Sequence, residues 1–518
     1  MPRNDPIPGP SSRQWALLVL SAAVLAVSGF RLLRDQAGVA ASLRPWMNRD
    51  VAQLLVLGRQ FLAGDRPYAD WFDPNFPATH LTTFGLAVLE RRTGVQSVHL
   101  FHGAVLLVAL LGCASLTMGK APGGRWSSAT LLAAYLVVLY CPSIPAGPEF
   151  GQREHVFTLV LLPWLAWRAG AVGAPPRALG WLLAILLGWM GCVKPVFLVV
   201  PLFVEIARGK SLPRLPGLDA GLVAAGAVVP FGLLALLWPD SMRAFVHETV
   251  PMLMARRAFA EFIIPLRDFV NRPQMRFVAG AGLALALLIL RGRSRGMLSR
   301  EESRIWMVAL LSAGAVALVQ RKGFTYHFIP VAGVAVMGLG VVLSRIVDAR
   351  MVTLVAVALV GLAYRSFAHV DRWGRIDFTP LGSLVGPGAE VMVCSTIVEY
   401  SADAYALDLR LVGPWGIHFT LAGILAEKDA AVRERELAAY RDRMVSSFTK
   451  MRPDVVLVRD IPEGRSGTLE DALTRSVHFL PLPGYRRFAP GEIARKFGGA
   501  GDWIVYRRAA SATGNTRR

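Results

Sequence analysis

The sequence predicts an all-α polytopic membrane protein with about 11 transmembrane helices, followed by a small C-terminal α/β domain. Of its 518 residues, 54% are hydrophobic and only 18% are charged. Apolar runs recur up to about residue 364, near the roughly 20 residues that a helix needs to cross a bilayer. Beyond that residue the apolar runs shorten to the length of β-strands.

The apolar runs give the expected spans. The first run, residues 15–33, has a basic flank but no cleavage site leading into a soluble chain, so we expect an uncleaved span. Lys194-Pro195 interrupts residues 178–206, and we expect a hairpin of two short helices there rather than one long helix. Proline disrupts a helix, and a lysine at mid-bilayer depth is costly. The expected spans are residues 15–33, 98–119, 127–140, 148–167, 178–193, 195–206, 221–238, 276–290, 305–320, 324–343 and 351–364.

Loop charges predict the orientation. With the N-terminus in the cytoplasm, the short inside loops are "KAPGGR", "RAGAVGAPPR", "ARGKSLPRLP", "RGRSRGMLSREESR" and "SRIVDAR". All are rich in Lys or Arg, as the positive-inside rule requires. A single helix over 178–206 would move the later basic loops outside. We therefore expect residues 34–97, 142–155, 239–275 and everything after 364 outside, in a multi-pass membrane protein.

The domain organisation follows from this change of pattern. We expect a transmembrane domain over residues 1–365, with a first outer loop at 34–97, and an outer, extracytoplasmic α/β domain over 366–518. The runs "EVMVCST", "PDVVLVRD" and "DWIVYRR" predict strands, and "LAEKDAAVRERELAAYRDRMVSSFTK" predicts a helix. The tail "AASATGNTRR" is predicted to be disordered.

Two compositional features exclude other classes. The net charge of +20 suggests nucleic acid, but much of the excess lies at the ends of apolar runs and no nucleic-acid motif accompanies it. We therefore expect membrane lipids as partners and no nucleic acid. The four cysteines show no ligand spacing, so we expect neither a metal site nor a redox site from them.

Polar clusters interrupt the apolar pattern at four places, all at the predicted outer boundary. They are the segment from "WMNRD" to "FPATH", then "PEFGQREH", "GCVKPVF" and "VQRKGFTYHFIP". Arginine suits bidentate phosphate recognition, and lysine acts as a point charge. Several cations at one membrane boundary indicate the phosphate of a lipid. The candidate phosphate-binding residues are Arg153, Lys194, Lys322 and Arg321.

Carboxylates and rings in the same clusters supply the other roles. Asp50 follows the first span, and it is our candidate base for an acceptor hydroxyl. The stretch "VAQLLVLGRQFLAG" after it predicts an amphipathic helix lying in the membrane interface. The remaining candidates for substrate binding or for orienting a neighbour are Glu149, Glu154, His155, Tyr326, His327, Asp70 and Asp73.

The layout resembles the GT-C class of integral-membrane glycosyltransferases, in the branch of aminoarabinose transferases and protein O-mannosyltransferases. The similarity rests on Asp50, "GDRPY", "DPNFPATH" and "CVKPVFLVVP", and "GQREH" and "QRKGFTYHFIP" resemble segments of uncharacterised members of the class. It implies a polyprenyl-phosphate-linked sugar as donor and a lipid, glycan or protein acceptor, with transfer on the outer face. This branch commonly has an Asp-Glu pair where this chain has Asn48-Arg49-Asp50. We therefore expect no cofactor, and a divalent cation remains an open alternative.

Two other functions fit the same residues. A transporter or flippase of a lipid-linked sugar would use the same cationic cleft, but internal repeats, which are typical of transporters, are not evident. An O-antigen ligase-like enzyme would differ in using a diphosphate-linked donor.

Overall fold

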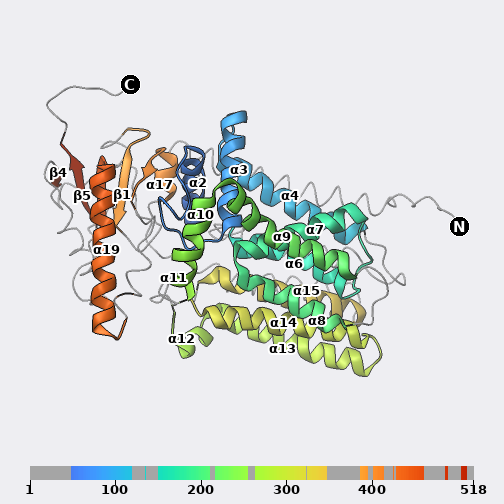
Figure 1. Cartoon of the computed structure of the whole chain (residues 1–518). Helices are drawn as coiled ribbons and strands as arrows, with labels where there is room; N and C mark the ends of the chain where they lie inside the picture. The colour runs from blue at the N-terminus through green and yellow to red at the C-terminus, as the bar shows by residue number, and fades with distance from the viewer. Residues whose placement is uncertain are drawn as a thin grey trace. The chain divides into compact units, whose positions relative to one another are not determined.

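The computed structural model describes residues 48–118, 135, 150–209, 216–254, 263–322, 324–346, 386–394, 401–413, 424, 427–459, 485–487 and 503–509. The chain forms two compact units (Figure 1). The first contains Met1–Asp35, His99–Pro230 and Ile264–Arg372. The second contains Gln36–Val98, Phe231–Ile263 and Trp373–Arg518. The expected spans 15–33 and 351–364, and nearly all of 127–140, lie outside the described residues, as do the domain boundary at 365 and almost all of the C-terminal tail.

The first unit is helical. Among the described residues, five helical segments that lie wholly or mostly in this unit are long and apolar enough to cross a membrane: Ser97–Met118, Ala220–Leu237, Pro273–Ser294, Arg300–Gln320 and Thr325–Leu343. They coincide with five of the expected spans. The elements are α4 (Ser97–Met118), α6 (Arg153–Arg168), α7 (Arg177–Val193), η1 (Pro195–Leu198), α8 (Val199–Arg208), α9 (Pro216–Leu237), α12 (Leu266–Val270), α13 (Pro273–Ser294), α14 (Arg300–Gln320), η5 (Thr325–Phe328) and α15 (Ile329–Ile346). The first two residues of α4 and the part of α9 from Phe231 onward belong to the second unit.

The helix is interrupted at Lys194, as the sequence predicts. Helix α7 ends at Val193, Lys194 is extended (φ −148°, ψ 93°), and Pro195 opens the short helix η1. The following helix, α8, packs against α14, whereas α7 packs against α6. Proline has no N–H to continue the ladder of α7, so the break follows from the sequence itself.

Helix α6 is the most enclosed helix among the described residues of this unit, and nearly every one of its side chains is buried. It contacts α7 and α15. Small residues bring α7 and α9 together: a Cβ on Gly188 would lie 1.9 Å from the Val223 carbonyl oxygen. Close backbone approach at small residues is how helices associate in a bilayer.

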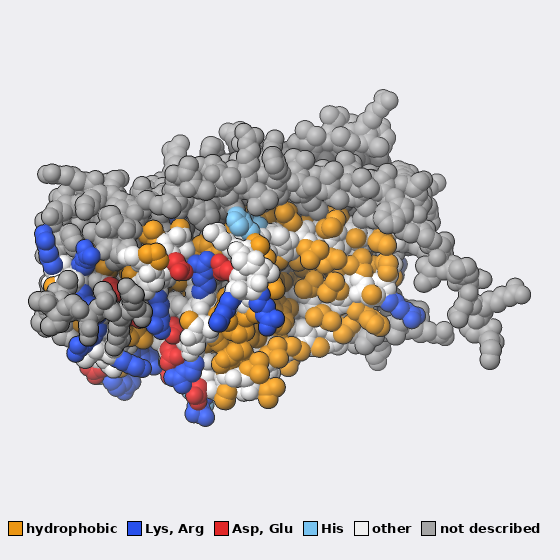
Figure 2. Space-filling model, turned by 90° about the horizontal axis from the view of Figure 1, so that it is seen from above, with side chains coloured by type: hydrophobic (Ala, Val, Ile, Leu, Met, Phe, Trp, Pro, Cys, Tyr) orange, Lys and Arg blue, Asp and Glu red, His pale blue; other side chains and the backbone are white. Residues whose placement is uncertain are grey.

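The outer faces of the long helices are apolar. Val228 on α9 is 65% exposed, Leu283 on α13 is 62% exposed, and Val319 on α14 is 71% exposed. Figure 2 shows hydrophobic side chains in a continuous area over the helices, whereas most Lys, Arg, Asp and Glu side chains gather elsewhere. A patch of this kind needs a partner or a lipid environment, which agrees with helices that face hydrocarbon.

The second unit combines helices with a five-stranded sheet. Its helices are α2 (Arg49–Leu62), α3 (Pro77–Thr93), α10 (Pro239–Ala244), the π-helix η3 (Phe245–Thr249), α11 (Val250–Met254), α17 (Ser401–Ala406) and α19 (Ala430–Met451). Its strands are β1 (Glu390–Cys394), β2 (Arg410–Leu411), β3 (Val455–Arg459), β4 (Tyr485–Arg487) and β5 (Trp503–Arg508), in the order β2-β1-β3-β5-β4. Strands β2, β1 and β3 are parallel, and β5 is antiparallel to both its neighbours.

The C-terminal elements match the sequence prediction. Strands β1, β3 and β5 and helix α19 are where the sequence places them. Strands β2 and β4 were not predicted, because two or three residues are too short to show alternation. Helix α19 packs Tyr440, Met444 and Phe448 on the sheet at a spacing of four residues, which is one helical face.

One residue of the first outer loop belongs to this same core. Phe72 is buried together with Met392, Val456 and Phe448. The first outer loop and the C-terminal α/β segment therefore share a hydrophobic core. The sequence assigned the two segments to different domains because the apolar runs shorten to strand length after residue 364.

Candidate functional site

A buried carboxylate is the centre of the candidate site in the first unit. Glu154, in the first turn of α6, is fully buried. Its Oε1 atom lies 2.6 Å from Lys194 Nζ and 3.5 Å from His327 Nε2. Lys194 lies at the helix break between α7 and η1, and His327 lies in the short helix η5. Three of the four polar clusters in the sequence therefore meet at one carboxylate.

Two further cations, Arg153 and Lys322, act on the cluster of Glu154 and His327. The charges of Lys194, Lys322 and Arg153 all act on the His327 ring, and those of Lys194 and Arg153 act on Glu154. Two cations thus act on the carboxylate and a third acts on the neighbouring imidazole, which leaves the cluster an excess of positive charge. Arg153 also begins α6, where the helix dipole favours an anion. The arrangement is suited to a ligand that carries negative charge.

Two buried polar atoms of the cluster have no hydrogen-bond partner among the described residues. They are Oε2 of Glu154 and Nδ1 of His327. Buried polar groups in folded proteins are almost always hydrogen-bonded to protein, water or ligand. These two atoms therefore mark where a polar ligand or water has partners in this cluster.

The segment after α14 fixes the position of His327. Arg321 ends α14 in the left-handed conformation (φ 40°), and its carbonyl accepts a hydrogen bond from the Ile264 N–H at 3.0 Å. Tyr326 stacks on Phe324 with ring centroids 5.4 Å apart and meets His327 edge-on at 4.5 Å. Arg321 thus shapes the turn that carries Lys322, and Tyr326 orients the imidazole.

His155 has a different local role. It is fully buried, and its Nδ1 accepts a hydrogen bond from the Gly151 N–H at 3.1 Å. Gly151 has φ 77°, and a Cβ there would lie 2.4 Å from Phe101. His155 therefore holds the turn that leads into α6. Glu149, on the other side of that turn, lies outside the described residues.

Asp50 belongs to the second unit. It lies in the first turn of α2, and the Asn48 side chain caps this helix by accepting from the Asp50 N–H at 2.9 Å. A carboxylate in the first turn is stabilised by the helix dipole. Helix α2 itself is as predicted, but its surroundings are not. Ten of its residues are buried, and it packs on α3, α17 and β2, so it presents no apolar face to a membrane interface.

Asp70 is bound within its own loop. The guanidinium of Arg66 lies 2.9 Å from the Asp70 carboxylate, and the Arg66 N–H donates to the same group at 2.8 Å. The hydrogen bond from the Arg66 side chain lowers the pKa of Asp70. The contacts of Asp70 are those of a residue that stabilises the "GDRPY" turn.

Asp73 is a buried partner of a histidine that the sequence reasoning missed. Its Oδ1 accepts from the Asn75 N–H at 2.7 Å and lies 3.6 Å from His80 Nε2. Tyr68 and Trp71 enclose the His80 ring at centroid distances of 5.1 and 5.0 Å. Both Asp73 and His80 occur in "DPNFPATH", so the motif contained the signal, but only the fold shows that they pair.

The described residues contain no group of three or more His, Cys, Asp or Glu side chains placed to hold a metal ion. The absence of a cofactor stays a prediction from the sequence.

Comparisons with known proteins give several similar structures, three of which are described below. One is ArnT from Cupriavidus metallidurans, solved bound to undecaprenyl phosphate, with 15% identity, 98% of this chain and 100% of that chain covered, and a TM-score of 0.42. Another is the arabinofuranosyltransferase AftD from Mycobacteria, with 14% identity, 97% of this chain covered and a TM-score of 0.41. A mutant of AftD matches with 14% identity, 98% coverage of this chain and a TM-score of 0.43.

The chain spans 40% to 42% of the length of the two AftD structures. No protein-family model matches the chain, and no curated protein matches it.

Proposed function

We propose that the chain is a membrane glycosyltransferase that takes a sugar from a polyprenyl-phosphate donor and passes it to an acceptor at the outer face of a bacterial inner membrane. The observation that carries the proposal is the Glu154 cluster, where Lys194 and Arg153 act on a buried carboxylate and Lys322 acts on the neighbouring His327. It lies at the ends of apolar helices. A lipid phosphate, whose tail stays in the bilayer, matches both the charge and the surroundings.

Two buried atoms that lack a hydrogen-bond partner in the described part of the chain, Oε2 of Glu154 and Nδ1 of His327, indicate the chemistry of the ligand further. Oε2 of Glu154 can only accept, as long as the carboxylate is ionised, and Nδ1 of His327 donates when it carries the ring proton. A sugar phosphate brings hydroxyl donors for the first atom and phosphate acceptors for the second. Without its sugar, the polyprenyl phosphate is a monoester whose dianion offers acceptors alone, so the two atoms together favour a donor that carries a sugar.

The proposed reaction has defined roles. Asp50 removes the proton from an acceptor hydroxyl as the hydroxyl oxygen attacks the anomeric carbon. The bond from that carbon to the phosphate oxygen breaks, and the electron pair leaves with the polyprenyl phosphate. Arg153, Lys194 and Lys322 stabilise the charge that grows on this leaving group. Lipid, glycan and protein acceptors all fit this chemistry.

A transfer assay in vesicles tests the proposal. Labelled polyprenyl-phosphate and polyprenyl-diphosphate sugars are offered to the wild type, Asp50→Asn, Lys194→Ala and the control Arg276→Ala, an exposed cation at the start of α13. We expect transfer from the monophosphate donor by the wild type and the control, and a loss of at least about tenfold in the other two. Full transfer by both site variants contradicts the mechanism. A sugar lipid that crosses the membrane unchanged indicates transport, and transfer from the diphosphate donor alone indicates a ligase-like enzyme.

A further inference from the structure

Arg59 joins the two helices of the first outer loop. It lies near the C-terminal end of α2, and its guanidinium makes a two-pronged contact with Glu90 of α3. Nε donates to Oε2 at 3.0 Å, and Nη2 donates to Oε1 at 2.6 Å. Such planar, bidentate pairs fix orientation as well as distance, and lysine does not reproduce them. The position of α2 on α3 therefore depends on this guanidinium.

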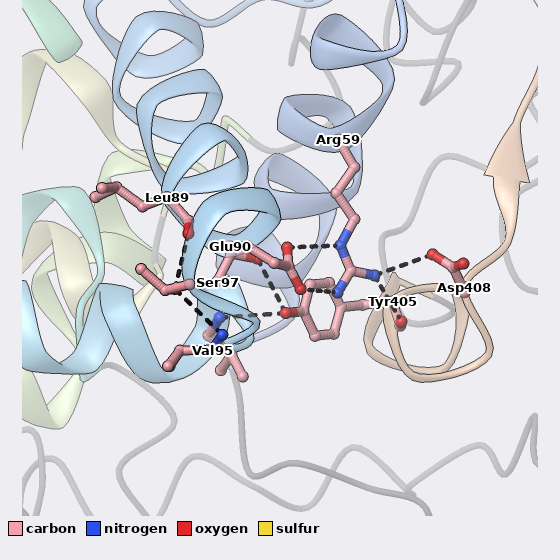
Figure 3. Close-up of polar contacts among 9 residues, drawn as sticks. Arg59, Leu89, Glu90, Val95, Ser97, Tyr405 and Asp408 are labelled. Carbon is pink, nitrogen blue, oxygen red and sulfur yellow. Dashed lines mark hydrogen bonds and ion pairs between the residues drawn. The ribbon is translucent and has the colours of Figure 1, made fainter.

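The same guanidinium also contacts the C-terminal α/β segment. Its Cζ lies 3.9 Å from the centroid of the Tyr405 ring, and Nη1 donates to the Tyr405 carbonyl at 3.3 Å. Nη1 also lies 3.3 Å from the Asp408 carboxylate. Figure 3 shows the guanidinium between the side chains of Glu90 and Asp408. One side chain thus connects α2, α3 and the segment around α17.

Tyr405 completes the connection at its other end. Its hydroxyl lies 2.9 Å from Ser97 Oγ and accepts a hydrogen bond from the Val98 N–H at 3.2 Å, at the start of α4. Burial raises the pKa of Tyr405, so the hydroxyl stays protonated. Tyr405 therefore spans from Arg59 to the connection between α3 and α4.

Independent contacts tie the same segments together. The Arg410 guanidinium lies 2.7 Å from the Asp65 carboxylate, and the Gln60 side chain donates to the Leu411 carbonyl. Phe72 is part of the core under the sheet. The backbone of α2 is also close to α3, since a Cβ on Gly58 would lie 2.6 Å from the Thr83 carbonyl oxygen. Helix α2 of the first outer loop is thus held both by α3 and by the C-terminal α/β segment.

We infer that the C-terminal α/β segment is a positioning element for α2, and that Arg59 is the positioning residue at which it acts. This rests on the proposed function, because the proposed base Asp50 lies in the first turn of α2. A helix is stiff over this length: nine residues at about 1.5 Å each put the two ends roughly 13 Å apart, so a tilt at Arg59 moves Asp50. A displacement of about 1 Å can lower the rate of a reaction about 100-fold.

Two conservative variants test the inference in the full-length protein in vesicles. Arg59→Lys keeps the charge but removes the fork, and Tyr405→Phe keeps the ring but removes the hydroxyl. Arg92→Lys, on an exposed residue of α3, is the matched control. We expect kcat to fall about tenfold or more in both variants with KM for the donor within about twofold, because the donor phosphate is assigned to other residues.

Hydrogen exchange gives a readout that does not depend on activity. We expect the amides of Val51–Phe61 to exchange at least about tenfold faster in both variants, while those of α13 and of the control variant stay at the wild-type rate. Unchanged exchange in α2 together with unchanged kcat overturns the inference. Faster exchange in α2 with wild-type kcat shows that the joint holds α2 without positioning Asp50, and this also overturns it. Faster exchange in a chain whose wild type transfers no sugar contradicts the proposed function and leaves the structural joint established.

Discussion

The buried pair of Glu154 and Lys194 predicts an asymmetric response to mutation. Lys194→Met leaves a carboxylate that is fully buried, whereas Glu154→Gln leaves an ammonium whose side chain is 18% exposed. Removing one partner of a buried ion pair typically costs about 3–5 kcal/mol, because the other charge stays buried. Arg153 still acts on Glu154 in the lysine variant. We therefore expect Lys194→Met to cost about 3 kcal/mol, the lower end of that range.

The exposure of Lys194 also sets the expected stability losses of Glu154→Gln and of the double variant, which complete a double-mutant cycle. In Glu154→Gln, water reaches Lys194 and the glutamine keeps the shape of the side chain, so we expect a loss of about 1–2 kcal/mol. The double variant carries no unpaired charge from this pair. We expect it to be less destabilised than the sum of the single changes by about 1–3 kcal/mol, which is the coupling energy of neighbours in one network.

The measurement is the free energy of unfolding in lipid–detergent mixtures, followed by tryptophan fluorescence, for the wild type and the three variants. Arg276→Met is the control for loss of an exposed cation, with an expected change within about 0.5 kcal/mol. The reasoning is refuted if Lys194→Met is no more destabilising than Glu154→Gln. It is also refuted if the two changes add to within about 0.5 kcal/mol, because independent sites behave that way.

Three further outcomes follow from the packing and from one carboxylate. Phe72→Ala should destabilise the second unit by about 3–5 kcal/mol, measured by urea unfolding, because it removes a buried ring from the shared core. Gly188→Val should lower the thermal midpoint markedly, since its Cβ would meet a backbone oxygen at 1.9 Å, whereas Gly232→Ala, with nothing within 4 Å, should not. The hydrogen bond from Arg66 lowers the pKa of Asp70. The stabilisation that the ionised Asp70 carboxylate gives the folded state is therefore present above its unfolded pKa of about 3.9, and it is lost as the pH falls below that value. Because Asp70→Asn removes this carboxylate, the variant should lose less stability than the wild type in an acid titration.

The sequence predicted the helices best where composition alone decides them. Five apolar runs appear as helices at the expected positions, and the break at Lys194 follows from Pro195. Strands β1, β3 and β5 were visible because each has five or six residues with a clear apolar pattern. The two short strands carry no such pattern. Periodicity reports burial over several residues, and it is silent below that length.

Part of the candidate site could be predicted from the expected membrane sidedness of its segments. Membrane sidedness brought "GQREH", "CVKPVF" and "QRKGFTYHF" to one boundary, and the structure joins Glu154, Lys194 and His327 there. The loop carboxylates were harder to interpret. Asp70 and Asp73 resemble ligand-binding residues in sequence, yet their neighbours Arg66 and His80 engage them locally. Sequence cannot show which of several nearby partners a short side chain selects, because that choice depends on the turn geometry.

Long-range pairs set the limit of sequence reasoning. Arg59 and Tyr405 are 346 positions apart, and neither residue belongs to a recognisable motif. Helix α2 looks amphipathic when it is considered alone, which led to the prediction of an interfacial helix. The missing information was the identity of what covers it, namely α3, α17 and β2. A single sequence gives the face of a helix that needs burial but not the partner that buries it.

There is a physical reason for a carboxylate, Glu154, at the centre of the proposed anion-binding cluster. Arg153, Lys194 and Lys322 would repel one another at low dielectric if no anion lay among them. Glu154 offsets part of that repulsion in the free protein, so the cations can be held together before a ligand arrives. Because Glu154 offsets only one of three charges, the cluster keeps an excess of positive charge, which suits the lipid phosphate of the proposed function. The adjacent residues Arg153 and Glu154 therefore have opposite tasks in "GQREH". Under the proposed function, Glu154 stabilises the free site, and Arg153, Lys194 and Lys322 keep the positive charge that an anionic lipid would bind.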